Sequence, residues 1–439
     1  MLPRDFIDLI SPIFADEMAD FEAAVAQPPV VSVRLNDKIS LPQFADCEAV
    51  AWCESGRYLT ERPNFTLDPL LHAGAYYVQE ASSMFLQQAL NHFVDKNARM
   101  LDFCAAPGGK TTLIAQHLTD GVLVANEFVR QRAYILAENV QKWGSPQVIV
   151  TNNATSDFAD FIGFFDAVLV DAPCSGEGMF RKDANAIDEW SLQNVQQCVA
   201  RQRQILADAW KCLKTNGILI YSTCTYNSLE NEENVRWLCQ HYDAEVLRIP
   251  LDDEWRVTET AEGYHFYPHR TRGEGLFLTV IHKKQTEQSA NLRLKNMPKN
   301  LGATEFVNYL KNADEYALFE QQNGLKMAFL QQCADLLQFC LKRLNVLHFG
   351  VPLAEPKGKD LIPQAGLALN KALNVQNFAT VEIDLPTALS FLRCEAINLP
   401  DAPRGFLLLT YQNLPIGWVK NIGNRCNNLY PQPWRIRHL

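Results

Sequence analysis

Two cysteines of this chain each follow a short apolar run, and thiols in that position suit nucleophilic chemistry. Cys174 closes the segment Asp166–Cys174, in which Asp171 directly follows the apolar residues, and Cys224 closes the segment Gly217–Cys224. If both runs are strands of one open α/β sheet, the loops at their carboxyl ends converge on a single crevice, where ligands bind. Two thiols and one carboxylate are therefore expected to meet at one site, and a thiolate there is a nucleophile.

A glycine turn upstream predicts a nucleotide-like cofactor at the same edge. The turn Cys104–Thr111 lies between a strand and the helical segment Thr112–Leu118, and it places Gly108 and Gly109 where a backbone must approach a ligand closely. The next strand ends at Glu127, 18 residues after Gly109. That interval is usual for a carboxylate that accepts hydrogen bonds from ribose hydroxyls.

Of two rival sites, these motifs weaken one and exclude the other. A Walker A loop ending in Gly109-Lys110-Thr111 needs a glycine at position 104, where Cys104 stands, so its phosphate cradle is incomplete. A zinc deaminase needs a cysteine where Glu177 stands and a His-x-Glu sequence, which the chain lacks. The 12 cysteines contain no Cys-x-x-Cys, so we expect no metal site and no disulfide framework.

Short apolar strands alternate with helical patterns from about residue 99 to 283 and predict the sheet that positions these residues. Such alternation is typical of a parallel sheet covered by helices. A small α+β unit with a strand at Val30–Leu35 is expected before it. The strands assigned to the sheet are Met100–Phe103, Val122–Asn126, Gln147–Thr151, Ala167–Val170, Ile218–Tyr221 and Leu276–His282.

The remainder of the chain predicts a linker, a helical unit and a basic tail. Lys283–Asn300 is polar and typical of a linker, and the amphipathic stretches Glu305–Ala317 and Met327–Leu344 favour helices. The tail Arg404–Leu439 contains no Asp or Glu. Guanidinium groups beside aromatic rings suit single-stranded or looped RNA, although a basic surface around a small β core has the same composition. The tail residues in question are Arg404, Lys420, Arg425, Arg435 and Arg437, with Tyr411, Trp418, Tyr430 and Trp434.

Composition places the chain among globular proteins of two or three domains. It has 439 residues, of which 47% are hydrophobic and 21% charged. The net charge of −10 means that a polyanionic partner has to be argued from local clusters. Neither a signal-peptide core nor a membrane-spanning run is present, so we expect a cytoplasmic protein with no membrane partner, and a monomer by default.

The motifs resemble those of the Sun-type RNA cytosine-5 methyltransferases, which use S-adenosylmethionine. The tail is similar to the RNA-binding PUA-like domain that closes one bacterial branch of this family, the branch typified by ribosomal small-subunit methyltransferase F. The resemblance covers nearly the whole chain. It rests on Phe103–Lys110, Asp171–Gly178 and Tyr221–Tyr226, with Arg34–Asn36 and Val78–Ser83 before them, and Gly417–Arg425 and Asn428–Pro431 in the tail.

The resemblance implies an α/β fold with a Rossmann-like methyltransferase sheet and helices on both faces. It adds a small N-terminal α+β domain and a C-terminal PUA-like β-rich domain. We accordingly assign residues 1–98 to an N-terminal RNA-binding appendage and 99–284 to the methyltransferase domain. Residues 285–365 are assigned to a linker and an intermediate helical domain, and 366–439 to the PUA-like domain.

The chemistry of the family explains the need for two thiols. Cytosine C5 reacts poorly with a methyl sulfonium, but a thiolate that adds to C6 makes C5 nucleophilic. The adduct then loses the C5 proton and expels the sulfur, which a second group can assist. The residues alone do not decide which thiol attacks. The resemblance implies attack by Cys224 and assisted release by Cys174. Asp171, which also suits a turn cap, would stabilise the N3/N4 edge of the ring.

S-adenosylmethionine is expected to lie on the glycine turn, with backbone amides as its main contacts. Lys110 either touches the carboxylate of the cofactor or only begins the helix, and Glu230 fits a helix-capping acid better than a catalytic one. The assigned cofactor residues are Cys104, Ala105, Ala106, Pro107, Gly108, Gly109, Lys110, Glu127 and Asp171.

One position departs from the family pattern. Family members commonly carry an acid after the third strand to hold the adenine amino group, but this chain has Ala154 there. Asn153 is an alternative acceptor through its side-chain carbonyl, and weaker cofactor affinity is expected if it does not serve.

The resulting prediction is methyl transfer to C5 of a cytosine in structured RNA, with 16S ribosomal RNA or the small ribosomal subunit as partner. The target base would be turned out of its stack to reach the thiols. Three alternatives stay open. They are a catalytically weak RNA-binding ribosome-assembly factor on the same fold, suggested by Ala154, transfer RNA as the substrate, and a P-loop-like nucleotide hydrolase, already weakened by Cys104.

Overall fold

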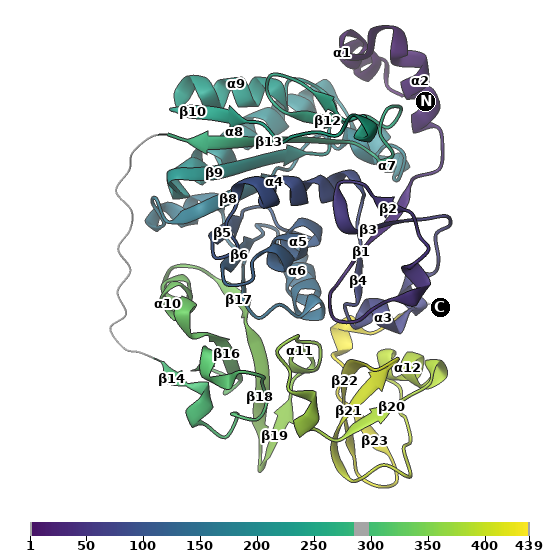
Figure 1. Ribbon diagram of the computed structural model, residues 1–439, viewed down its shortest axis with the longest axis vertical. Helices are drawn as coiled ribbons and strands as arrows, with labels where there is room; N and C mark the ends of the chain where they lie inside the picture. Colours follow the sequence, from purple (N-terminus) through teal and green to yellow (C-terminus); the bar gives the residue numbers. More distant parts are fainter. Residues whose placement is uncertain (1, 285–297, 438–439) are drawn as a thin grey trace.

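The computed structural model describes residues 2–284 and 298–437 and is built around one large sheet (Figure 1). Among the described residues this sheet has ten strands, in the order β11-β12-β13-β9-β8-β5-β6-β7-β17, with β10 paired to β13. The five strands from β9 to β7 in this order are parallel, and β13 and β17 flank them in antiparallel pairing. The strands are β5 (Arg99–Asp102), β6 (Val122–Asn126), β7 (Val148–Thr151), β8 (Phe165–Asp171), β9 (Leu213–Thr223), β10 (Ala244–Leu247), β11 (Thr258–Glu259), β12 (Tyr264–Phe266), β13 (Leu276–Lys283) and β17 (Val346–Phe349).

Helices cover both faces of this sheet because successive residues of each strand point to opposite sides. Met100 of β5 packs against α4, α5 and α6, and the next residue, Leu101, packs in the cluster that contains α8, α9 and α10. The predicted fold class is therefore confirmed. The helices are α4 (Leu86–Phe93), α5 (Gly109–His117), α6 (Arg130–Trp143), α8 (Leu192–Cys212), α9 (Glu232–His241) and α10 (Ala334–Arg343).

All six strands predicted for the sheet are present. β6 has the predicted bounds, whereas β9 begins at Leu213, five residues before the predicted Ile218. The five residues of β6 are all buried, as expected for a parallel strand covered on both sides.

The N-terminal part forms a second sheet in the order β2-β3-β1-β4, preceded by two helices. Phe6 and Phe21 of these helices pack with Phe180, which follows β8, and Tyr226, which follows β9. The N-terminal helices thus lie against the loops that carry the two candidate thiols. The elements are α1 (Arg4–Phe14), α2 (Met18–Val25), β1 (Val31–Leu35), β2 (Ala49–Val50), β3 (Cys53–Leu59), α3 (Pro69–His72) and β4 (Tyr76–Val78).

A buried arginine joins the N-terminal sheet to helix α5. The Arg34 guanidinium donates to Gln79 Oε1 at 2.7 Å, Gln116 Oε1 at 2.6 Å and Thr112 Oγ1 at 2.5 Å, and lies 4.3 Å from the ring centroid of Trp143. A buried cation with its donors satisfied fixes the groups around it. Arg34 therefore holds the first turns of α5 against the N-terminal sheet.

The helical prediction for residues 285–365 is largely wrong, because this part is mainly a third sheet. Glu305–Ala317 contains only a 3₁₀ turn before β15 begins at Tyr316, and Asn312 in its middle has a left-handed φ of 52°, which a helix cannot contain. The second stretch, Met327–Leu344, begins as strand β16 and turns helical only at α10. The third sheet comprises β14 (Lys299–Asn300), β15 (Tyr316–Glu320), β16 (Lys326–Leu330), β18 (Val351–Lys357) and β19 (Asp360–Pro363), followed by α11 (Ala365–Ala368).

The predicted linker Lys283–Asn300 lies mostly outside the described residues. Its first residue ends β13, and Lys299–Asn300 form β14. None of the helices in residues 2–284 and 298–437 combines the length and the apolar character that a bilayer crossing requires.

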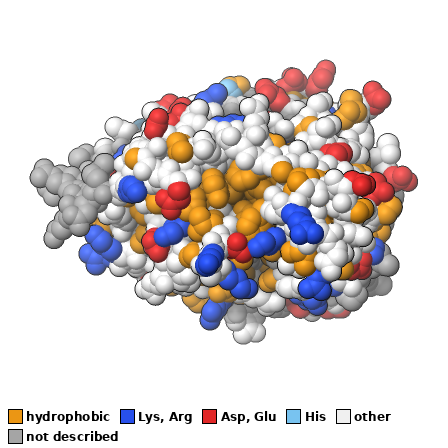
Figure 2. All heavy atoms as spheres, turned by 90° about the horizontal axis from the view of Figure 1, so that it is seen from below, with side chains coloured by type: hydrophobic (Ala, Val, Ile, Leu, Met, Phe, Trp, Pro, Cys, Tyr) orange, Lys and Arg blue, Asp and Glu red, His pale blue; other side chains and the backbone are white. Residues whose placement is uncertain are grey.

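The C-terminal residues form a fourth sheet whose aromatic residues only partly match the RNA-contact prediction. Trp418 and Tyr430 are 1% and 4% exposed and pack in the core, so they cannot stack on bases. Arg425 and Arg435 are exposed, and Lys and Arg side chains surround an apolar band on the lower face of the molecule (Figure 2). The elements are β20 (Thr380–Glu382), α12 (Leu385–Leu392), β21 (Gly405–Tyr411), β22 (Leu414–Asn421) and β23 (Cys426–Asn428).

Candidate active site

The predicted cofactor residues Cys104–Lys110 form the turn between β5 and α5 and the first two residues of α5. Gly108 has a φ of 117°, which residues with a side chain rarely adopt, and α5 begins at the following residue. Two side chains of α6 hold the turn. Arg132 Nη2 donates to Ala106 O and Asn139 Nδ2 donates to Pro107 O, each at 2.8 Å. The turn is therefore rigid before any ligand arrives.

Glu127 lies at the end of β6, beside this turn, and is 4% exposed. Its Oε1 accepts the Val129 N–H at 2.8 Å, and its Oε2 lies 3.7 Å from Arg132 Nη1. Because Arg132 contacts both the carboxylate and the turn, the two predicted parts of the cofactor site are held in one arrangement.

Asp102, at the end of β5, is a site residue that the sequence reasoning missed. Its Oδ2 accepts the Thr111 hydroxyl at 2.7 Å, but its Oδ1 is buried with no hydrogen-bond partner among the described residues. Burial raises the pKa of Asp102 to about 7, against the hydrogen bond from Thr111 and with the charge of Asp171 adding to the shift. An unpaired buried oxygen beside a glycine turn fits the ammonium group of S-adenosylmethionine. An acid at a strand end directly before the turn was the available signal.

We expect Asp102→Asn to weaken S-adenosylmethionine binding by about tenfold or more, because it removes a charge-assisted hydrogen bond. The carboxyl is neutral below its pKa of about 7 and ionised above it, so wild-type affinity should rise as the pH passes through 7, with proton release on binding at lower pH. Calorimetry in two buffers of different ionisation enthalpy measures both effects. Exposed Asp95→Asn is the matched control, and unchanged affinity and proton release in Asp102→Asn would contradict this role.

Asn153, the alternative adenine acceptor, already has partners on both ends of its amide. Its Oδ1 accepts the Asn345 N–H at 2.9 Å, and its Nδ2 donates to Asp157 Oδ2 at 3.1 Å. The same Asp157 oxygen accepts the Ala154 N–H at 3.0 Å. The Asn153 amide is therefore held toward the residue that precedes β17.

The two candidate thiols meet, as predicted. β8 and β9 are parallel neighbours, with Asp171 opposite Ser222, so the loops that follow them begin side by side. Cys174 Sγ and Cys224 Sγ are 3.1 Å apart, which is within hydrogen-bonding distance for two sulfur atoms. Two cysteines that only filled the core would not need to contact each other. The contact therefore favours a shared chemical role.

Asp171 and Lys110 form an ion pair beside the thiols. Lys110 Nζ lies 2.7 Å from Asp171 Oδ1, and the Ser222 hydroxyl donates to the same oxygen at 2.7 Å. The Lys110 side chain is 13% exposed, and burial opposes its charge, but the Asp171 carboxylate and the nearby Cys224 raise the pKa of Lys110 above its usual value. Lys110 therefore contacts the Asp171 carboxylate, a partner that neither of the two sequence alternatives named.

The surroundings shift the pKa values of the two thiols in opposite directions. The hydrogen bond with Cys174 lowers the pKa of Cys224, and the Lys110 ammonium lowers it further against burial. The same hydrogen bond raises the pKa of Cys174 well above its usual value, and burial and the Glu230 charge act in the same direction. The arrangement thus favours a Cys224 thiolate that accepts the Cys174 S–H.

The predicted capping role of Glu230 is only half present. Asn227 Oδ1 accepts the Glu230 N–H at 3.0 Å, as a cap requires, but α9 begins two residues later and the Glu230 carboxylate bonds Ser175 instead of the Asn227 N–H. The Asn227 N–H is taken by Glu177, which lies three residues after Cys174.

Comparison with known proteins gives the same picture over most of the chain. Residues 89–282 match the family "16S rRNA methyltransferase RsmB/F", residues 2–81 the "N-terminal domain of 16S rRNA methyltransferase RsmF", and residues 378–436 the "Methyltransferase RsmF PUA domain". A Pectobacterium atrosepticum protein named ribosomal RNA small subunit methyltransferase F is 32% identical, over 98% of this chain and 95% of its own.

Further relatives extend the similarity to another bacterium and to a solved structure. An Escherichia coli protein of the same name is 33% identical over 94% of this chain and 92% of its own. The crystal structure of a methyltransferase homologue from Pyrococcus horikoshii, 27% identical, superposes with a TM-score of 0.56 over 64% of this chain and 95% of its own.

Proposed function

The chain belongs to the ribosomal RNA small subunit methyltransferase F family, and from this membership we propose that it methylates C5 of a cytosine in 16S ribosomal RNA. It is an RNA methyltransferase that uses S-adenosylmethionine. The observation that carries the assignment of roles is the pair of thiols 3.1 Å apart beside the Lys110–Asp171 ion pair. We place the reaction in the cytoplasm, where bacterial ribosomal RNA is found. We propose a monomer as its working form.

Cys224 is the proposed nucleophile. The Cys174 S–H and the Lys110 ammonium lower the pKa of Cys224 and so favour its thiolate, which is the form that bonds C6 of the target cytosine. Bonding at C6 moves electron density to C5, which becomes the nucleophile for the methyl group. When bound, S-adenosylmethionine supplies that methyl group as a sulfonium. Asp102, Glu127 and the backbone of the Cys104–Lys110 turn are the residues proposed to hold it.

Asp171 is the proposed partner of the cytosine N3/N4 edge. Its carboxylate is held by Lys110 and by the Ser222 hydroxyl, and its side chain keeps 31% exposure, which leaves it open to a base. A carboxylate accepts a hydrogen bond from the cytosine amino group and stabilises positive charge at N3, and uracil offers O4 instead of an amino group. Lys110 fixes the orientation of this carboxylate and adds positive charge beside Cys224.

Cys174 is the proposed release residue. Its Sγ lies 3.1 Å from Cys224 Sγ, close enough for a Cys174 S–H to stabilise the thiolate that leaves as the C6–S bond breaks and the C5 proton passes to solvent water. The raised pKa of Cys174 keeps it protonated for this step at neutral pH.

The test of the proposed function uses tritiated S-adenosylmethionine with small ribosomal subunits and, separately, with transfer RNA. We expect label in 16S ribosomal RNA that is recovered as 5-methylcytosine after digestion to nucleosides. Label in transfer RNA alone would assign the other substrate. RNA binding without any label would identify an assembly factor. Either result contradicts the proposal.

A further inference from the structure

Two buried glutamates cross between the loops that carry the thiols. Glu177, in the loop after Cys174, reaches the other loop, where its Oε2 accepts the Tyr226 N–H at 2.7 Å and the Asn227 N–H at 3.0 Å. These two backbone amides lie two and three residues after Cys224. The loop of the proposed nucleophile is therefore held by an acid from the loop of its partner.

Glu230 makes the reverse connection. It belongs to the segment after Cys224, and its Oε2 accepts the N–H of Ser175, the residue directly after Cys174, at 3.1 Å. Its Oε1 accepts the Ser175 hydroxyl at 2.5 Å, and its Oε2 also accepts Gln202 Nε2 at 2.7 Å. The backbone next to the proposed release thiol is thus tied to the far loop.

The two carboxylates share a donor and are cut off from water. Asn227 Nδ2 donates to Glu177 Oε1 at 2.7 Å and to Glu230 Oε1 at 2.9 Å, and neither glutamate is exposed. Burying two acids side by side is costly unless every oxygen is hydrogen-bonded. A fold that only needed to close these loops could use apolar side chains, so the crossed carboxylates point to a requirement for fixed backbone positions.

We propose that Glu177 and Glu230 are positioning residues that set the geometry of the two thiols separately, Glu177 for Cys224 and Glu230 for Cys174. This inference rests on the proposed thiol roles. It predicts that removal of each glutamate impairs a different step of the reaction. Loss of Glu230 should displace the release thiol and leave attack possible, whereas loss of Glu177 should displace the nucleophile itself.

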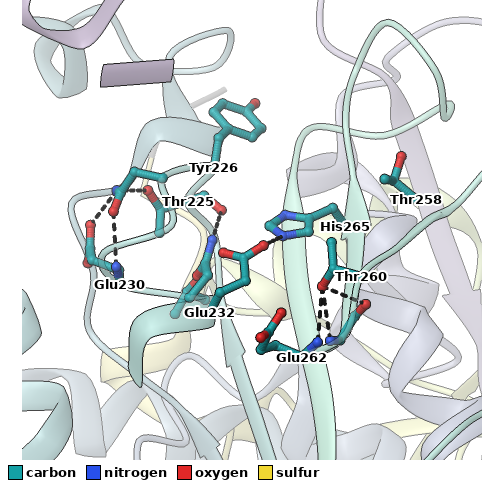
Figure 3. A network of polar contacts seen from close by, with 12 residues as sticks. Thr225, Tyr226, Glu230, Glu232, Thr258, Thr260, Glu262 and His265 are labelled. Atoms are coloured by element: carbon teal, nitrogen blue, oxygen red, sulfur yellow. Dashed lines mark hydrogen bonds and ion pairs between the residues drawn. The ribbon is translucent and has the colours of Figure 1, made fainter. Parts of the chain in front are cut away.

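The neighbouring Glu232 provides a matched control within the same segment. It is also a buried acid, but it bonds His265 Nε2 at 2.6 Å, and Figure 3 shows this pair apart from Glu230. Among the described residues it makes no hydrogen bond to the loop of Cys174 or to that of Cys224. Glu232→Gln therefore measures how much turnover is lost when a buried acid in this segment is neutralised without changing the thiol loops.

The experiment compares Glu177→Gln, Glu230→Gln and Glu232→Gln in the full-length protein with labelled RNA and S-adenosylmethionine. The readouts are turnover and the fraction of protein in a denaturant-stable complex with RNA. We expect Glu230→Gln to lower turnover about 10- to 100-fold and to accumulate the complex, as a displaced release thiol would. Glu177→Gln should lose turnover to a similar degree without the complex. Glu232→Gln should show wild-type behaviour in both readouts.

Cys174→Ala, run alongside, separates failure of this inference from failure of the proposed function. If Cys174→Ala forms no stable complex, the proposed thiol roles fail. If it does form one but Glu230→Gln does not, or if Glu177→Gln also forms one, the separate positioning roles are overturned and the thiol roles stand. Ser175→Ala keeps both acids and removes the 2.5 Å hydroxyl bond to Glu230, together with the longer contacts of that hydroxyl to Thr225 Oγ1 at 3.0 Å and Glu177 Oε1 at 3.3 Å. It is the second variant should Glu230→Gln not fold. It should accumulate a smaller fraction of the same complex, and none would count against the inference.

Discussion

Cys224→Ala is expected to abolish methyl transfer, with a loss of about 10⁴-fold or more, because no other group can add to C6 and activate C5. The alternative thiol does not substitute for it. Removing Cys224 takes away the hydrogen bond and the charge that help to raise the pKa of Cys174, but burial and the Glu230 charge still act to raise it and so oppose formation of a Cys174 thiolate. The measurement is incorporation of label from S-adenosylmethionine into small ribosomal subunits.

The matched control is Cys239→Ala, because this half-buried cysteine of α9 lies outside the proposed site. Both variants should bind S-adenosylmethionine with wild-type affinity, since the thiols are not among the residues proposed to hold it. Transfer by Cys224→Ala at more than about a tenth of the wild-type rate is incompatible with a covalent role for this sulfur, given the size of the loss expected for a nucleophile.

Cys174→Ala is expected to trap the enzyme on its RNA. The adduct at C6 forms, because Cys224 and the Lys110–Asp171 pair are intact, but the leaving sulfur has lost the group that stabilises it. Turnover should fall on the order of a hundredfold or more, and a protein–RNA species that survives denaturant should appear. Gel electrophoresis under denaturing conditions, with labelled RNA, measures that species.

The double variant Cys174→Ala/Cys224→Ala decides whether the trapped bond involves Cys224. It should form no denaturant-stable species. The reverse outcome, in which Cys224→Ala alone traps RNA, would exchange the two roles, because it would make Cys174 the sulfur that bonds C6.

The residues predicted from the sequence were those whose positions follow from local pattern. Strand ends, a glycine turn and an acid at a fixed interval are short-range signals, and they located Cys174, Cys224, Asp171 and Glu127 at one edge of the sheet. Parallel strands put their carboxyl ends at the same edge, so a correct strand order was not needed to bring these side chains together.

What could not be predicted depends on contacts between distant segments. The i, i+4 spacing of Phe306 and Leu310 resembles a helix face, but both side chains are buried without an α-helix, since Asn312 adopts a left-handed conformation. The crossed acids Glu177 and Glu230 are separated in the sequence by the short helix Ala184–Glu189, by α8 and by β9. The partners that tie each acid to the opposite loop include backbone amides, which leave no mark in a pattern of residue types.

One edge of the central sheet is formed by β17, a strand that follows the methyltransferase strands by more than 60 residues in the sequence. β17 pairs with β7, and α10 packs on the same sheet. These two elements therefore belong to the structural unit that holds the thiols. A protein shortened to residues 1–284 would present the bare amides and carbonyls of β7 to solvent and invite association through them. A truncated protein of this kind should therefore aggregate. A shortened version of the enzyme should retain residues 334–349.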